Sequence, residues 1–217
     1  MKSILTFLFL SLSIFQIVGQ TKKDSLLVFV GQKISVISSP EVIPNDTIIQ
    51  DGDTLISVTT GMDSRFLCRY KILNILNGYY KLDTISFYAY DHYGIPAFSE
   101  FNTVLLFVTP NNNKYYHQKY QYFDVYLADN GYWASLYAAG DYNHPFKNEI
   151  SVKPELIKFK EEVSYPIDKL SNDDIQQWYP KPYYKIEKGK AIAVYGNYIE
   201  DLFRLKQQTI LKARGIY

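Results

Sequence analysis

The chain has 217 residues, 17% of them aromatic, and its 23 Lys and Arg side chains nearly balance 22 Asp and Glu. A near-neutral chain lacks the electrostatic footprint of proteins that bind nucleic acid or anionic membrane surfaces, so we expect neither as a partner. Cys68 is the only cysteine, which excludes an intrachain disulfide and leaves the core alone to stabilise the fold.

The first residues have the order of a secretory signal peptide. Lys2 precedes an apolar run from Ile4 to Val18, and the small residue Gly19 follows. The run is shorter than the roughly 20 apolar residues that span a bilayer. We therefore predict a signal peptide over residues 1–19 and a secreted, periplasmic or cell-surface mature chain of zero net charge with no membrane span. An uncleaved N-terminal anchor is the alternative.

Strand patterns begin directly after this segment. Residues 26–38 are rich in β-branched and aromatic side chains, and Gly31 in the middle predicts a bulge or bend. Residues 39–53 contain two prolines and the turn signal Asp51-Gly52, which indicate a surface loop with a β-hairpin at its end.

Four further strands are predicted at short spacing, over residues 66–76, 84–90, 103–109 and 115–126, separated by Gly-, Pro- and Asn-rich turns. Such a run without helical patterns favours an all-β barrel or sandwich. Cys68 shares one strand face with Phe66, Tyr70 and Ile72, which predicts a buried and inert thiol. An intermolecular disulfide or a reactive thiol is the alternative.

The rest of the chain has a looser pattern. Residues 132–138 fit a strand or a short helix, residues 155–165 and 190–195 fit strands, and Ser171 can cap a short helix that ends at Trp178. The clearest helix is the last one, with Asn197 as its expected cap, Glu200 completing a capping box and Gly215 following its end.

The strand motifs resemble those of TIMP and netrin-like (NTR) OB-fold modules, including plain bacterial exported versions. The motifs are VFVGQKISV, FLCRYKILNILNGYY, DTISFYAY and VLLFV, within residues 26–109. The resemblance implies an OB fold and use outside the cytoplasm. TIMP inhibitors act through a Cys-x-Cys at the mature N-terminus, whereas this chain would begin near Gln20-Thr21-Lys22, so the resemblance implies no inhibitory residue.

The predicted fold is therefore mostly β: an OB-like or related small antiparallel β-barrel with a C-terminal α-helix packed on it. We expect the barrel core over residues 20–126 and a C-terminal extension over residues 127–217, packed on the same core.

The aromatic load suggests a binding surface. In the strand predicted after Asn113, the even positions Tyr116, Tyr120, Tyr122 and Tyr126 should share one face, because side chains of a strand alternate. A row of tyrosines is a platform on which sugars or peptides can stack. Tyrosines that merely cover the rim of a small barrel are the alternative.

We predict an exported, non-enzymatic binding or protein-interaction module for an extracellular or periplasmic protein or glycan. The sequence shows no catalytic motif, and the spacing of its histidines fits no metal-binding pattern, so no cofactor is expected. An inhibitor or periplasmic assembly factor is a variant of this prediction. The rival is a secreted hydrolase with a site assembled from scattered residues: Asp91, His92, His117, Asp141 and His144.

Overall fold

The structure is a computed structural model, which describes residues 26–41, 46–50, 53–57 and 61–217. The predicted signal peptide, residues 1–19, lies outside the described residues. Within the described ranges, none of the helices combines the length and the apolar character that crossing a bilayer requires.

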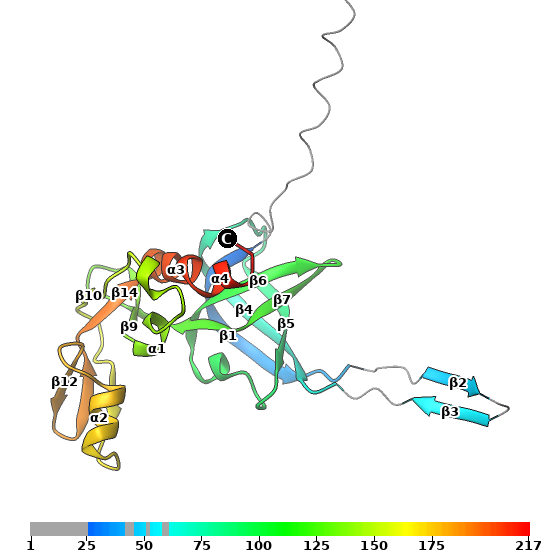
Figure 1. Cartoon of the computed structure of the whole chain (residues 1–217). Coiled ribbons are helices and arrows are strands. Elements are labelled where there is room, and N and C mark those ends of the chain that lie inside the picture. The colour runs from blue at the N-terminus through cyan, green and yellow to red at the C-terminus, as the bar shows by residue number, and fades with distance from the viewer. Residues whose placement is uncertain (1–25, 42–45, 51–52, 58–60) are drawn as a thin grey trace, which may run out of the picture.

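The main sheet consists of β1 (Leu27–Ser38), β4 (Ser64–Asn77), β5 (Thr84–Asp91), β6 (Thr103–Asn111) and β7 (Lys114–Asp124). Its strand order is β1–β4–β5–β7–β6, and β6 pairs again with β1 (Figure 1). The prediction of a mostly β fold is confirmed, and the bend predicted at Gly31 coincides with a register shift between Val30 and Gly31.

The prediction of antiparallel pairing is wrong for one pair of strands in the main sheet. β5 and β7 run parallel and share a single residue pair, Tyr88 with Tyr116. The reason is geometric: five strands whose pairing returns to its start cannot alternate in direction all the way round. At least one pair must then be parallel.

Residues 27–30 of β1 and 104–108 of β6 are buried on both faces, which explains their uninterrupted apolar runs. Their inner face, together with β4 and β5, encloses a core that contains Phe29, Tyr70 and Phe87. Cys68 lies in this core without solvent exposure, and burial raises the pKa of its thiol to about 12. The prediction of a buried thiol is confirmed.

The outer face of β1 and β6 is covered by two terminal helices, α3 (Ile199–Gln208) and α4 (Ile210–Ala213). Ile199, Leu202 and Leu211 join the outer-face residues Val28 and Phe107 in a second apolar cluster. The predicted packing of a C-terminal helix on the sheet is confirmed.

The predicted cap of this helix is wrong. Tyr198 occupies the N-cap position without a side-chain hydrogen bond, and Asn197 is the preceding strand residue. The amide of Asn197 donates to the carbonyl oxygen of Lys153 at 2.9 Å and accepts from the Tyr142 hydroxyl. Because Asn197 is buried, both polar atoms of its amide need partners, and these two long-range bonds supply one to each.

Between β1 and β4, the strands β2 (Asp46–Gln50) and β3 (Asp53–Ser57) form the predicted hairpin, which projects away from the main sheet in Figure 1. The predicted Asp51-Gly52 turn lies outside the described residues.

The C-terminal extension adds two small sheets. One has the order β10–β14–β9–β8 and the other the order β11–β13–β12. Residues 155–165 do not form the predicted single strand: only two residues pair at its start, and the chain then crosses to the second sheet. The bounds are β8 (Tyr126–Leu127), β9 (Trp133–Leu136), β10 (Glu155–Leu156), β11 (Ser164–Pro166), β12 (Tyr184–Glu187), β13 (Lys190–Ala193) and β14 (Tyr195–Tyr198).

Within the described ranges, the remaining short helices are η2 (Ala97–Glu100), α1 (Ala139–Tyr142), η3 (Lys147–Glu149) and α2 (Asn172–Trp178). The predicted cap of α2 is confirmed, because the Ser171 hydroxyl accepts from the Asp174 amide at 3.1 Å and Asp174 completes a capping box.

Candidate binding cleft

The strand β7 is interrupted where the predicted tyrosine row should run. Against β6, His117 pairs with Val108 but Tyr122 pairs with Leu106. Four residues of β7 therefore face a single residue of β6, and Tyr120 within this bulge has a φ of 65°. Bulges re-aim side chains and occur often next to functional sites.

The bulge separates the four predicted tyrosines, so the expectation of one shared face is wrong. Tyr116 lies against Tyr88 and Tyr90, with ring centroids 5.8 and 6.4 Å apart. Tyr122 instead packs against the inner core. The physical reason is that the bulge changes the alternation of the strand.

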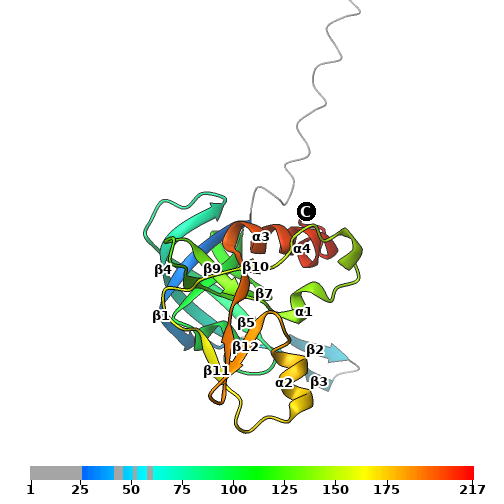
Figure 2. The ribbon, with the colours of Figure 1, turned by 90° about the vertical axis from the view of Figure 1, so that its left-hand side faces the viewer.

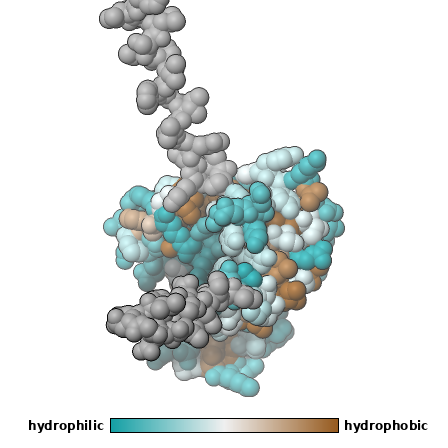
Figure 3. All heavy atoms as spheres, turned by 90° about the vertical axis from the view of Figure 1, so that its right-hand side faces the viewer, coloured by the Kyte–Doolittle hydropathy of each residue, from teal (hydrophilic) through white to brown (hydrophobic). Residues whose placement is uncertain are grey.

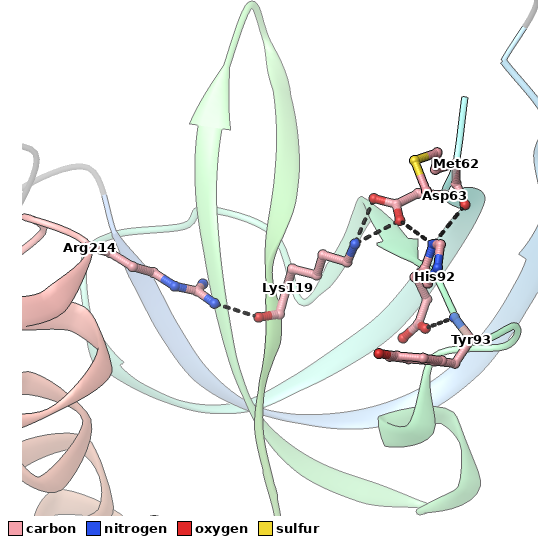
Figure 4. Close-up of polar contacts among 7 residues, drawn as sticks. Met62, Asp63, His92, Tyr93, Lys119 and Arg214 are labelled. Atoms are coloured by element: carbon pink, nitrogen blue, oxygen red, sulfur yellow. Dashed lines mark hydrogen bonds and ion pairs between the residues drawn. The ribbon is translucent and has the colours of Figure 1, made fainter. Parts of the chain in front are cut away.

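The bulge is held from two sides (Figure 4). The Lys119 ammonium binds the carboxylate of Asp63 at 2.6 Å, and His92 lies on the other side of that carboxylate, 3.6 Å away. From the terminal helices, the Arg214 guanidinium donates to the carbonyl oxygen of Lys119 at 2.8 Å. Within the bulge, His117 Nε2 donates to the carbonyl oxygen of Gln121 at 2.7 Å.

Beside the bulge lies an open cleft of about 690 Å³. It is bounded by β7, β9, α1, the end of α2 and β12, and Figure 2 shows α1, α2 and β12 gathered on this side of the molecule. Tyr120 and Tyr122, two of the predicted ligand-binding residues, line it. The other aromatic lining residues are Phe123, Tyr137, Tyr165, Trp178, Tyr179 and Tyr184.

The aromatic walls of the cleft are held in place by contacts with one another. Tyr165 stacks on Tyr179 at 5.5 Å, and Tyr179 meets the edge of Tyr184 at 5.1 Å. The Tyr184 hydroxyl donates to the carbonyl oxygen of Tyr137 at 2.7 Å. Trp178, at the end of α2, remains 63% exposed. The tyrosine walls of the cleft are therefore pre-formed, whereas the indole ring of Trp178 is largely exposed to solvent.

Two carboxylates and one ammonium line the same cleft. The Lys206 ammonium binds the Asp141 carboxylate at 2.8 Å and lies 4.4 Å from the ring centroid of Phe123. Asp124 has no such cation among the described residues: burial raises the pKa of its carboxyl, and hydrogen bonding to Tyr126 and Ser135 offsets part of that rise. Tyr126, the fourth predicted tyrosine, does not line the cleft but is hydrogen-bonded to Asp124, which does.

The residues of the rival hydrolase prediction do not assemble into one site. Of the five, only Asp141 lines the cleft. Asp91 and His117 border a hollow of about 20 Å³, which has room for little more than one water molecule. Burial lowers the pKa of His117 to about 4. The remaining two lie apart, with His92 beside Asp63 and His144 accepting from the amide of Phe146 at 3.2 Å.

Across the described part of the chain, no group of three or more His, Cys, Asp or Glu side chains is placed to hold a metal ion.

Sequence reasoning missed most of the cleft. The sequence places Asp124 in a predicted strand but does not single it out as a site residue, and it predicts Trp178 only as the end of a short helix. Tyr137, Tyr165, Tyr179 and Tyr184 come from segments with no shared motif. The one local signal was the high density of tyrosine itself.

No protein-family model, no curated protein and no solved structure shows significant similarity to this chain. The geometry of the cleft is therefore the main indication of a function.

The backbone of Tyr120 provides a first test, because residues other than glycine rarely adopt a positive φ. Asn tolerates this conformation, whereas Val does not. Both Tyr120→Asn and Tyr120→Val remove the ring, so their difference reports backbone strain. We expect the Val variant to be less stable than the Asn variant by about 1–2 kcal/mol in urea unfolding. Equal stability would contradict the left-handed backbone at this position.

Proposed function

We propose that this chain is an exported, non-enzymatic binding module that holds a protein or glycan ligand in the cleft beside β7. The observation that carries the proposal is a pre-formed cleft of about 690 Å³ with eight aromatic side chains in its lining. This volume lies within the usual range of ligand pockets, about 300–1,000 Å³. Tyrosine and tryptophan provide large contact areas at low entropic cost.

Two parts of the proposal rest on the sequence. Export rests on the signal-peptide pattern of residues 1–19, and kinship with NTR modules rests on the strand motifs within residues 26–109. The hydrolase alternative remains a prediction, which no geometric feature of the five named residues favours.

Figure 3 shows the face of the molecule opposite to that of Figure 2. Over the coloured part of this face, hydrophobic residues form separate spots among hydrophilic ones. Isolated apolar residues are normal on a protein surface and do not define a docking site. The clustered aromatic lining of the cleft is the stronger candidate.

Replacing Trp178 with alanine is expected to weaken ligand binding at least tenfold without changing the fold, because the exposed indole contributes contact area but little packing. The mature chain, residues 20–217, would be crosslinked in its native compartment and screened on a glycan array. Every ligand found would then be titrated against the variant.

Tyr79→Ala is the matched control, because Tyr79 is 81% exposed and does not line the cleft. The proposal requires that binding survive this change. A ligand bound equally by the wild type, the Trp178→Ala variant and the control would place the binding site elsewhere.

A further inference from the structure

Acidic side chains outnumber basic ones among the residues that line the cleft. Asp124 and Asp141 line it, and Lys206 is the single basic residue among its lining side chains. Lys206 is already bound to Asp141. Among the described residues, the Oδ2 atom of Asp124 is buried without a hydrogen-bond partner. The lining therefore holds a carboxylate whose charge is not balanced by a neighbouring cation.

The influence of Asp124 extends to the surrounding rings. Burial, and after it the charge of Asp124, raises the pKa of Tyr122 and of Tyr165. Tyr165 comes from the C-terminal extension and Tyr122 from β7, so the carboxylate acts on both walls of the cleft. A negative charge among aromatic faces is the environment that favours an organic cation.

The chain itself contains an example of such binding. Lys206 is 8% exposed, and its ammonium is held between the Asp141 carboxylate and the Phe123 ring. The aliphatic part of a lysine is narrow enough to follow apolar walls while its charged end reaches a polar partner. Asp124 with Tyr122 and Tyr165 offers the same combination of carboxylate and rings, without an internal cation.

We propose that the cleft recognises a primary ammonium group, presented by a lysine side chain of a protein partner, with Asp124 as its counter-charge and the tyrosine rings as its walls. This inference rests on the proposed binding function and specifies its ligand. A protein partner is favoured over an amino sugar because the Oδ2 atom of Asp124 is buried, and a thin lysine side chain approaches a buried carboxylate more closely than a sugar ring does.

The test compares two peptides that differ only in the charged group: acetyl-Gly-Lys-Gly-amide and its norleucine analogue. The chain has two tryptophans, so their indole N–H signals in an NMR titration separate the cleft from the rest of the molecule. Trp178 lines the cleft, and Trp133 does not. We expect the lysine peptide to shift the Trp178 signal with at least tenfold higher affinity than the norleucine peptide.

Asp124→Asn should weaken lysine-peptide binding at least tenfold, while Glu155→Gln, which removes an acid on β10 outside the cleft, should leave it unchanged. If the Asn variant does not fold, the comparison of the two peptides on the wild-type chain still tests whether the cleft recognises the ammonium group. Equal binding of both peptides, lost in Trp178→Ala, would overturn the ammonium assignment and leave the binding function standing.

Two other outcomes would also overturn the inference. One is the absence of any Trp178 shift with the lysine peptide. The other is tighter binding of the glucosamine disaccharide than of the lysine peptide, which would assign the amine to a glycan. In both cases a ligand identified by crosslinking and lost in Trp178→Ala would still support the proposed function, so the two failures are distinguishable.

Discussion

Replacing Phe98 with alanine is expected to lower the free energy of unfolding by about 3–5 kcal/mol, the usual range for a buried phenylalanine. Phe98 is 1% exposed and comes from η2, the short helix between β5 and β6. Its ring centroid lies 6.0 Å from that of Tyr70, 6.1 Å from Phe87 and 4.7 Å from His117. Truncation would leave a cavity at the end of the inner core that these rings cannot fill.

The measurement is urea unfolding, with the midpoint and the slope fitted separately. Tyr79→Ala, which removes an exposed ring, should change the free energy of unfolding by no more than about 0.5 kcal/mol. A loss below about 1 kcal/mol for Phe98→Ala would show that η2 does not insert this ring into the core.

The same change has a consequence for the cleft. Phe98 also packs against Tyr122, with ring centroids 6.1 Å apart, and Tyr122 lines the cleft. The inner core and the candidate site are therefore joined through one tyrosine. For this reason, a Tyr122→Ala variant would mix loss of packing with loss of a ligand contact, and the exposed Trp178 is the better residue for testing binding.

A second large effect is expected at Gly196, where alanine should cost about 3 kcal/mol of stability. Gly196 is a buried residue of β14, paired with Leu136 of β9 on one side and with Glu155 of β10 on the other. A Cβ atom at this position would lie 1.9 Å from the carbonyl oxygen of Ser135. Because that neighbour is backbone, the strands would have to separate.

Gly140→Ala is the matched control, since a Cβ atom at Gly140 meets nothing within 4 Å. Gly140 lies in the short helix α1, where alanine is favoured over glycine by up to about 1 kcal/mol. Thermal and urea unfolding should therefore rank Gly140→Ala at or above the wild type and Gly196→Ala well below it. Comparable stability of the two variants would contradict the close approach of β9 and β14.

Local patterns predicted the secondary structure where each element depends on its own residues. The five long strands follow from alternating or continuous apolar residues, the bend at Gly31 follows from the lack of a side chain, and the Ser171 cap of α2 follows from a capping box. The same kind of argument failed at Asn197, because the partners that fix its side chain, Tyr142 and Lys153, are distant in sequence.

By itself, the sequence determined a mostly β chain with a single buried cysteine and a helix near its end. Only the tertiary structure decided where the tyrosines lie, because the bulge in β7 depends on its register against β6 and on the contact from Arg214. The cleft is likewise a product of folding: Asp124, Tyr165 and Trp178 meet there from separate segments. Contacts of this kind leave no periodicity in the sequence, since their geometry is set by how the elements pack.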